Sequence, residues 1–328
     1  MTTDLLIIGA GPIGIACGIE ATLRGVPHII LEKGCLLDAI HRYPPQLVFF
    51  STPELLELAN VPFVTAGGKP TRSEVLHYYR RLTEHFRLNV SLYEAAERIE
   101  RDPGRGFLVR TSRGRGHEAR FVVIANGFYD HPNLMGIEGE DLPKVTHYYL
   151  DPHPFWRRKV AVIGAQNSAV EAALELWRSG AKVTLIHRGP GLGSGVKYWV
   201  RPDIENRIQE GSIQALFGVE LERIRESSVV LRRTDGTRFE IENDFVFALT
   251  GYHPDREFLE RAGVKIDPGS LRPVLDPATM ETNVPGLYVA GVAAGGRDAN
   301  RIFIENSRGH ARLILEDVAS KLARQGVA

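Results

Sequence analysis

DLLIIGAGPIGIACGIEATLRGVPHIILEKG at residues 4–34 and KVAVIGAQNSAVEAALELWRSGAKVTLIHRG at residues 159–189 are two copies of one pattern, and they align without a gap. In each copy an apolar run of strand type enters a glycine turn, continues as a helical pattern and ends in a second apolar run. This order is typical of the βαβ unit that binds dinucleotides. The sequence therefore predicts two nucleotide sites in one chain.

The first copy carries the residues expected around a pyrophosphate and an adenosine ribose. Gly9 permits the tight turn, Gly11 lets the backbone approach the pyrophosphate, and Gly14 lets the helix pack close to the strand. The unpaired N–H groups at the helix N-terminus face the phosphates. Glu32 ends the second strand, where its carboxylate can accept hydrogen bonds from both ribose hydroxyls. An ordinary buried strand with a glycine turn would leave Glu32 unexplained.

The second copy departs from the first at two points. Gln166 replaces the middle glycine and Ala169 replaces the last one. Alone, this turn is therefore a weak signal of nucleotide binding. Its register with the first copy strengthens that signal. His187 stands where the first copy has Glu32, and Arg188 follows it. A cation there favours a 2′-phosphate and predicts NADPH. Lys197, further along, is either an additional phosphate ligand or a solvated surface charge.

The composition indicates a compact enzyme of about two domains. Of the 328 residues 43% are hydrophobic, which is ample for two cores. Forty basic and forty acidic residues cancel without long runs of one sign, so neither nucleic acid nor a membrane surface is expected as a partner. No apolar stretch reaches the ~20 residues that span a bilayer. The first strand begins at Leu5 and leaves no room for a signal peptide, so a cytoplasmic location is expected.

Further strands and two helices are predicted outside these units. The expected strands cover residues 90–93, 107–111, 121–124, 229–232, 244–249 and 287–290. Thr71 is a good N-cap for a helix over 72–86. A last helix is expected to begin near Phe303, with an apolar stripe at Ala311, Ile314, Leu315, Val318 and Leu322. If its N-terminus faces a flavin, its positive dipole end would stabilise the negative charge that develops on reduction.

The ordered set GAGPIG, Glu32, the ANG turn at 125–127, a second unit with a basic pair, TGY at 250–252 and PGLYVAG at 285–291 resembles the thioredoxin reductase type of flavoprotein. The resemblance covers nearly the whole chain. Within that group, KPTRSEVLHYYRRL, IGAQNSAVEAALEL, GVKYWVRPDIENRIQEGSI and GRDANRIFIENSRGHA are similar to the YpdA family of bacillithiol disulfide reductases. Gln166, and Val292 where thioredoxin reductases have an aspartate, agree with that family.

The resemblance implies an α/β fold with two Rossmann-like dinucleotide-binding domains of the thioredoxin reductase type. Residues 1–150 and 255–328 would form a discontinuous FAD domain, and residues 151–254 an inserted NADPH domain. Hydride would pass from NADPH to the flavin, and two electrons would then reduce bacillithiol disulfide to two thiols. Related folds commonly form homodimers, so a homodimer or a higher homo-oligomer is expected by analogy.

The motifs and the resemblance together name the residues of both sites. Those expected to bind FAD are Gly9, Gly11, Pro12, Ile13, Gly14, Glu32, Lys33, Ala125, Gly127, Gly291, Val292, Ile302 and Phe303. Those expected to bind NADPH are Gly164, Gln166, Asn167, Ser168, Ala169, His187, Arg188, Lys197, Thr250 and Gly251.

Cysteine usage separates this chain from thioredoxin reductases. The two cysteines, Cys17 and Cys35, are too far apart in sequence for a CxxC pair, which excludes a dithiol relay of that kind. Several YpdA-like proteins have a cysteine where Ile13 stands here. Cys17 follows one helical turn later and is a catalytic candidate, but a buried packing role is the favoured interpretation. No other catalytic residue is assigned, and the histidines show no metal-ligand spacing, so no metal is predicted.

Other functions fit the same cofactors. An NADPH reductase for ferredoxin, flavodoxin, quinone or oxygen would have the same two nucleotide units. A flavin monooxygenase would as well, and it would show a long-lived flavin hydroperoxide. A flavoprotein module that senses redox state without turnover is the alternative outside enzymes, and failure of NADPH to bleach the flavin would favour it.

Overall fold

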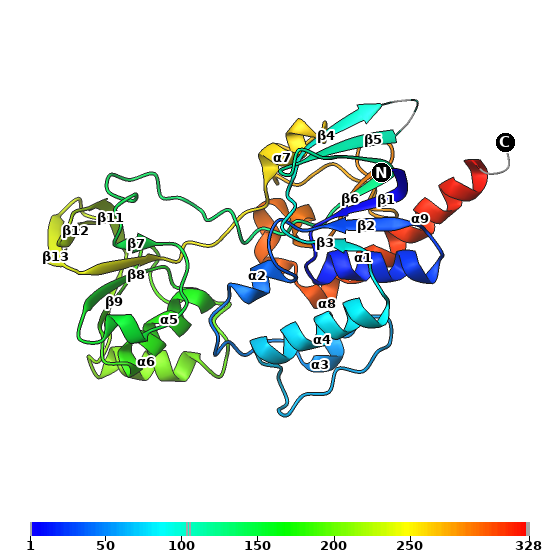
Figure 1. Cartoon of the computed structure of the whole chain (residues 1–328). Helices are drawn as coiled ribbons and strands as arrows, with labels where there is room; N and C mark the ends of the chain where they lie inside the picture. The colour runs from blue at the N-terminus through cyan, green and yellow to red at the C-terminus, as the bar shows by residue number, and fades with distance from the viewer. Residues whose placement is uncertain (1, 103, 105, 326–328) are drawn as a thin grey trace. The chain divides into compact units, whose positions relative to one another are not determined.

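The computed structural model describes residues 2–102, 104 and 106–325, which fall into two compact units (Figure 1). The first unit contains the chain up to His131 and again from Tyr252 onward, and the second runs from Pro132 to Gly251. The sequence placed residues 132–150 with the first domain. The structure groups them with the second unit, since their strand β7 (Val145–Thr146) pairs with β14 (Phe245–Ala248) in its sheet.

The sheet of the first unit has a parallel centre and an antiparallel edge. Its strands run in the order β3 (Val90–Ser91), β2 (His28–Leu31), β1 (Thr2–Ile8), β6 (Gly116–Ile124), β5 (Gly106–Thr111) and β4 (Ala96–Asp102). The first part of β6 pairs with β5, and its last part pairs in parallel with β15 (Leu287–Val289). The C-terminal stretch therefore returns to the first unit, as predicted.

The side chains of β1 alternate between two hydrophobic cores. Leu5 and Ile7 belong to a buried cluster that includes helix α1 (Pro12–Leu23), whereas Leu6 and Ile8 belong to a second cluster. A strand that is apolar on both faces is typical of a sheet covered on both sides. This packing fixes the carboxyl end of β1, where the first glycine turn begins.

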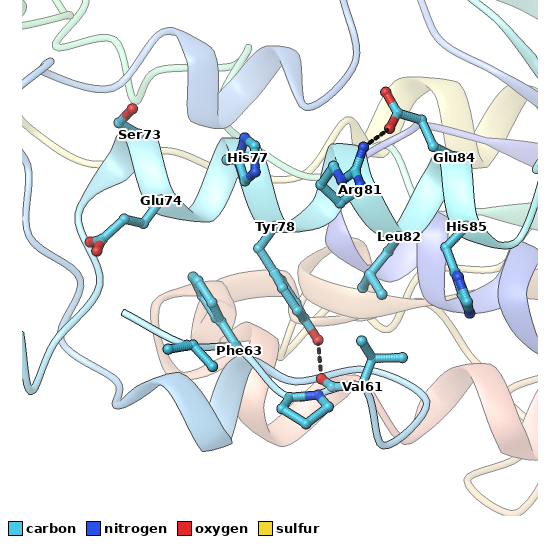
Figure 2. Close-up of a pocket in the computed structure, with 12 residues that line it drawn as sticks. Val61, Phe63, Ser73, Glu74, His77, Tyr78, Arg81, Leu82, Glu84 and His85 are labelled. Carbon is cyan, nitrogen blue, oxygen red and sulfur yellow. Dashed lines mark hydrogen bonds and ion pairs between the residues drawn. The ribbon is translucent and has the colours of Figure 1, made fainter. Parts of the chain in front are cut away.

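Helix α4 (Arg72–His85) begins at the residue that the sequence predicted. The Thr71 hydroxyl accepts a hydrogen bond from the Glu74 backbone N–H, and the Glu74 carboxylate accepts one from the Thr71 N–H at 2.8 Å, which completes a capping box. A cavity of about 730 Å³ lies along this helix, and Figure 2 shows residues that line it. Beside it Tyr78 stacks on Phe63 and donates a hydrogen bond to the Val61 carbonyl at 2.8 Å.

The predicted single helix from Phe303 is wrong, because the structure divides it into α8 (Ile304–Ser307) and α9 (His310–Gln325). Arg308, at the break, donates hydrogen bonds to the carbonyls of Glu54 and Glu57, next to α3 (Pro53–Leu56). The glycine that follows it lowers the helical preference further. The apolar stripe is confirmed within α9, where Ala311, Ile314, Leu315 and Val318 are buried and Leu322 packs against them.

The remaining helical segments of the first unit are short. They are α2 (Asp38–His41), α7 (Arg256–Arg261) and the 3-10 turns η2 (Gly291–Ala294) and η3 (Gly296–Arg301). The turns η2 and η3 connect β15 to α8. They therefore carry the chain from the end of a parallel strand, where ligands bind in such sheets, to the last helices.

The second unit repeats the arrangement with a five-stranded parallel sheet. Its order is β10 (Gln214–Phe217), β9 (Lys182–His187), β8 (Lys159–Ile163), β14 and β7. Val160 and Val162 of β8 face one core, and Ala161 and Ile163 face the other, as in β1. The helical segments are η1 (His153–Phe155), α5 (Asn167–Arg178) and α6 (Arg201–Gln209). Both predicted βαβ units, β1–α1–β2 and β8–α5–β9, are confirmed.

A three-stranded antiparallel sheet completes the second unit. It consists of β11 (Val219–Ile224), β12 (Ser228–Arg233) and β13 (Arg238–Glu242). Its charged side chains pair across strands, with Arg232 2.6 Å from Glu220 and Arg238 2.7 Å from Glu222. Across both units, none of the helices in the described ranges is long and apolar enough to cross a membrane.

Candidate functional site

The glycine turn of the first unit is built so that only one of its glycines opens to solvent. Gly9 has φ +105°, and a Cβ added there would lie 2.5 Å from the Ala125 carbonyl oxygen. A Cβ on Gly14 would collide with the Gly9 carbonyl, whereas one on Gly11 would meet no atom within 4 Å. Gly9 and Gly14 thus allow the strand, turn and helix to pack closely. Gly11 leaves the backbone open to a ligand, as the predicted pyrophosphate role requires.

A cavity of about 450 Å³ gathers the predicted FAD residues, and it lies within the first unit. Its lining includes Gly9, Gly11, Pro12, Ile13, Glu32, Lys33, Ala125, Gly127, Gly291, Val292, Ile302 and Phe303. Gly14 is the exception, because it lies beneath the turn against Gly9. These residues follow the carboxyl ends of β1, β2, β6 and β15, where ligands bind in parallel sheets. Segments far apart in sequence therefore contribute to one site.

The Glu32 carboxylate stabilises the glycine turn through two backbone hydrogen bonds. It is 7% exposed, and its two oxygens accept hydrogen bonds from the Ala10 N–H at 2.8 Å and the Gly34 N–H at 2.9 Å. Burial raises the pKa of Glu32, against the effect of those two hydrogen bonds. Each oxygen retains a second lone pair for a ligand hydroxyl. The sequence predicted the ribose role and missed the bond to the glycine turn.

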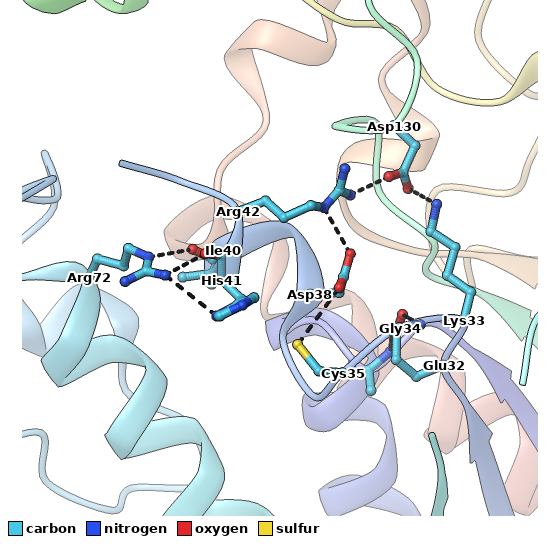
Figure 3. A network of polar contacts seen from close by, with 11 residues as sticks. Glu32, Lys33, Gly34, Cys35, Asp38, Ile40, His41, Arg42, Arg72 and Asp130 are labelled. Carbon is cyan, nitrogen blue, oxygen red and sulfur yellow. Dashed lines mark hydrogen bonds and ion pairs between the residues drawn. The ribbon is translucent and has the colours of Figure 1, made fainter. Parts of the chain in front are cut away.

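An ion-pair network lines the same cavity beside Glu32 (Figure 3). Asp130 lies 2.7 Å from the Lys33 ammonium and also pairs with Arg42, whose Nε donates to Asp38 at 2.9 Å. Burial raises the pKa of Asp130, but the hydrogen bonds and charges of Lys33 and Arg42 outweigh it and lower that pKa. The network joins the loop after β2 to the loop after β6. Sequence reasoning identified Lys33 and missed the other three members of the network, Asp38, Arg42 and Asp130.

The other end of the cavity is more apolar. Gly291, at φ +68°, follows β15, and a Cβ there would lie 3.0 Å from the Ile13 side chain. The Gly291 N–H donates to His310 Nδ1 at 3.2 Å, so the proton of this imidazole is on Nε2. Burial lowers the pKa of His310, which favours this neutral form. Because the long helix begins at His310, the dipole role predicted for a long helix starting at Phe303 is not supported.

Neither cysteine is in a setting that activates a thiol. Cys17 is 0% exposed on the buried side of α1, and burial, followed by the charge of Glu20, raises the pKa of its thiol to about 12. Cys35 is partly exposed, and its Sγ lies 3.7 Å from an Asp38 oxygen. Burial and Asp38 raise the pKa of Cys35 as well. Since the thiolate is the reactive form, this geometry favours a packing role for Cys17.

The second glycine turn has the same backbone with different side chains. Gly164 has φ +130°, and an added Cβ would lie 2.6 Å from the Leu249 carbonyl and 3.1 Å from the Ala169 Cβ. Ala169 therefore occupies the place of the third glycine without a clash. The Gln166 side chain fills space against Gly193, in the loop after β9. The middle position of this turn is thus occupied, where Gly11 leaves the first turn open.

The loop after β9 is fastened to the start of α5. Asn167 Nδ2 donates to the Gly195 carbonyl at 2.8 Å, and the Lys197 N–H donates to Asn167 Oδ1 at 2.8 Å. Lys197 is 8% exposed, and its ammonium lies 2.5 Å from Glu171. The geometry therefore favours an anchoring role for Lys197. Ser168 lies exposed in the first turn of α5.

His187 and Arg188 lie at the end of β9, beside the Gly164 turn. Gly164 donates to the Ile186 carbonyl at 3.0 Å, which places the two strand ends side by side. Burial, and then the Arg188 charge, lower the pKa of His187, so Arg188 provides the positive charge near neutral pH. Thr250 and Gly251 follow β14, and the Thr250 hydroxyl donates to the Asn133 carbonyl at 2.6 Å. Together these residues surround the carboxyl edge of the second sheet.

Comparison with known proteins assigns the family. Residues 6–291 match the family described as pyridine nucleotide-disulphide oxidoreductase. The bacilliredoxin reductase Bdr of Bacillus subtilis is 42% identical over 316 residues, which cover 96% of this chain and 97% of that protein. The structure of the bacillithiol disulfide reductase Bdr (YpdA) from Bacillus cereus is 41% identical, with a TM-score of 0.94 over 98% of this chain and 100% of that one.

The fold is shared more widely. Thioredoxin reductase from T. acidophilum has a TM-score of 0.77 at 22% identity, covering 98% of this chain and 99% of that one. The predicted fold of the thioredoxin reductase type is thus confirmed, and family membership implies a flavin and a nicotinamide nucleotide as cofactors. The chain is an oxidoreductase that belongs to the Bdr (YpdA) group of the pyridine nucleotide-disulphide oxidoreductase family.

Proposed function

We propose that this chain uses NADPH and FAD to reduce the disulfide of a low-molecular-weight thiol, most specifically bacillithiol disulfide. One observation carries the proposal: a single cavity gathers all the residues that the sequence assigned to FAD except Gly14. The full-length similarity to a protein named bacillithiol disulfide reductase supports the choice of substrate. The overall reaction consumes one NADPH, one proton and one disulfide, and it yields NADP⁺ and two thiols.

The residues around the cavity fit FAD because both of its ends have partners. Gly11 leaves the turn open to the pyrophosphate, and Glu32 offers lone pairs to the adenosine ribose. At the other end Val292, Ile302 and Phe303 give an apolar lining for the flavin ring. When bound, the flavin supplies two-electron chemistry between a nicotinamide and a disulfide. FMN has no adenosine and would leave Glu32 without its ligand.

The second unit supports NADPH over NADH through the end of β9. His187 takes the place of the acidic residue that would accept hydrogen bonds from the 2′-hydroxyl of NAD, and the cation Arg188 follows it directly. A guanidinium binds a phosphate through paired charge-assisted hydrogen bonds. Gly164, together with the residues after β14, offers the backbone edge along which the dinucleotide would lie.

Because neither Cys17 nor Cys35 is activated, we place no protein thiol in the proposed electron path. The chain's own contribution is to bind both nucleotides, exclude water from the apolar end of the first cavity and hold the Gly291 turn in place. Related folds commonly form symmetric dimers, so a cytoplasmic homodimer is part of the proposal, and light scattering of the purified protein would test the dimer.

The decisive experiment is anaerobic NADPH oxidation by the FAD-loaded protein with bacillithiol disulfide, with glutathione disulfide and without acceptor. Nicotinamide absorbance and free thiol are followed together. Two thiols per NADPH with bacillithiol disulfide, and none with the other two, are expected. Bleaching of the flavin without thiol release would reject a low-molecular-weight disulfide as the substrate.

A second electron acceptor is suggested by the curated relative, whose name specifies bacilliredoxin. The same assay with an oxidised bacilliredoxin added tests it. Faster thiol release with the protein acceptor than with the free disulfide would move the proposal to a protein disulfide and leave both cofactor assignments intact.

A further inference from the structure

A fully buried carboxylate, Glu94, lies outside the cavity and has no part in the function proposed above. We propose that Glu94 is a positioning residue for the adenosine end of the FAD site and that it acts through Glu32. This inference rests on the proposed binding of FAD in the cavity of the first unit. Glu94 itself does not line that cavity.

Three polar side chains hold the Glu94 carboxylate, each from a different strand. It accepts hydrogen bonds from the Ser91 hydroxyl of β3 at 2.6 Å and from the Thr111 hydroxyl of β5 at 2.8 Å. His117 Nε2 of β6 lies 2.9 Å from the same carboxylate. The Arg113 guanidinium is 3.9 Å away. Glu94 is 0% exposed, so this set of donors replaces its water shell entirely.

The carboxylate remains ionised in this setting. Burial raises the pKa of Glu94, but the hydrogen bonds from Ser91, His117 and Thr111 together lower it to about 2. An ionised carboxylate can only accept hydrogen bonds, so His117 Nε2 must carry the proton and donate. The Glu94 carboxylate is thus a buried negative charge that is hydrogen-bonded to side chains of three strands.

Backbone hydrogen bonds connect this centre directly to Glu32. The Glu32 N–H donates to the Ser91 carbonyl at 2.9 Å, and the Glu94 N–H donates to the Glu32 carbonyl at 2.8 Å. The peptide groups on both sides of Glu32 are therefore held by residues 91 and 94, and the Glu94 side chain ties those two residues together. The next residues along the chain, Ala95 and Ala96, line the cavity.

The turn that Glu94 closes has an unfavourable backbone. Tyr93 has φ +57°, a left-handed conformation that a tyrosine rarely adopts, and its N–H donates to the Gly34 carbonyl at 3.1 Å. A strained turn persists only when surrounding interactions fix it. The Ser91 bond to Glu94 provides such an interaction. Loss of the carboxylate would relax the turn and move the Glu32 oxygens away from their place beside the ribose.

The test is the FAD affinity of the full-length protein carrying Glu94→Gln, which keeps the volume and removes the charge. Release of FAD from the holoprotein on dilution, followed by the fluorescence of free flavin, gives the dissociation constant. We expect the FAD dissociation constant to rise ~10-fold, which is the effect of losing one charge-assisted hydrogen bond. The kcat at saturating FAD is expected within about twofold of wild type, because no group near the reacting atoms changes.

Asp317→Asn is the matched control. Asp317 also accepts from a buried hydroxyl, that of Tyr288 at 2.6 Å, and from the Lys321 ammonium at 2.6 Å, but it does not line the cavity. Its loss should reduce stability and leave FAD affinity unchanged. If both variants weaken FAD equally, Glu94 is only a structural residue and the inference fails.

Coupling to Glu32 is the sharper measurement. If Glu94 acts through Glu32, then adding Glu94→Gln to Glu32→Gln should raise the FAD dissociation constant less than twofold further. If the two substitutions raise the FAD dissociation constant independently, so that their factors multiply in full, the inference is overturned. Ser91→Ala, which removes one of the three donors, gives the same comparison if Glu94→Gln does not fold. Failure of wild-type protein to bind FAD would reject the proposed function, not the link between Glu94 and Glu32.

Discussion

The two units share a βαβ arrangement with a glycine turn and differ in the side chains beside that turn. Gly9 and Gly164 both have positive φ, and each packs against the carbonyl of a residue that follows a neighbouring strand, Ala125 in one unit and Leu249 in the other. At the middle position of the turn, Gly11 leaves open space in the first unit, whereas the Gln166 side chain packs against Gly193 in the second unit. The comparison teaches that strand packing fixes the turn, whereas the side chains beside the turn differ between the two units.

The largest expected effect tests the third position of the two turns. Gly14→Ala would place a methyl group against the Gly9 carbonyl. We therefore expect the free energy of unfolding to fall by about 3 kcal/mol and the purified protein to retain less FAD. The matched change is Ala169→Gly in the second unit, which should cost only ~1 kcal/mol. Denaturant unfolding and flavin content measure both. Equal costs would contradict the difference in packing between the two turns.

The next effect tests the nucleotide preference of the second unit. Arg188→Ala should raise the KM for NADPH about 10- to 100-fold, because a phosphate loses a charge-assisted partner. The KM for NADH should stay nearly constant, and steady-state kinetics with both nucleotides measures the pair. Arg178→Ala, at the far end of α5, is the control and should alter neither. A similar rise for both nucleotides would remove the 2′-phosphate assignment.

A smaller effect concerns pH, because each unit has a partly buried histidine with a lowered pKa. For His310 and His187 the unfolded state binds protons more readily than the folded one, so stability is complete above about pH 6.5 and declines as pH falls below it. His310→Asn retains an acceptor for the Gly291 N–H without a titrating group. Its unfolding free energy should therefore fall less than that of wild type between pH 7.5 and pH 5.5.

Part of the dependence of the unfolding free energy on pH should persist in His310→Asn, since burial also lowers the pKa of His28. His310→Leu, which removes the acceptor, should lose stability at both pH values. An unchanged slope in His310→Asn would show that His310 does not titrate during unfolding.

The smallest effect concerns Cys17. Cys17→Ala should leave disulfide turnover unchanged and cost ~1 kcal/mol of stability, as expected for a small buried side chain. Thiol release and thermal unfolding measure the two quantities. Loss of turnover with stability intact would show that the buried thiol takes part in the reaction.

Local patterns predicted the turns well, because a glycine turn and the strand before it depend on neighbouring residues. The edge strand β4 was missed because Ile99 is its one buried residue. Its many charged side chains give the sequence pattern that is typical of a loop. The break at Arg308 was missed because it depends on hydrogen bonds to carbonyls about 250 positions away in sequence. The pairing of Lys33 with Asp130 was missed for the same reason, since Asp130 follows a different strand.

The insertion of the second unit also sets the order in which the two sites can form during synthesis. A ribosome completes the contiguous stretch from Pro132 to Gly251 before it has made β15, η2 and α8, which close the first cavity. Domains generally fold as units as the chain emerges. The second unit can therefore reach its native state on the ribosome. The first unit cannot complete its cavity until the last part of the chain has been made, because residues after β15 line that cavity.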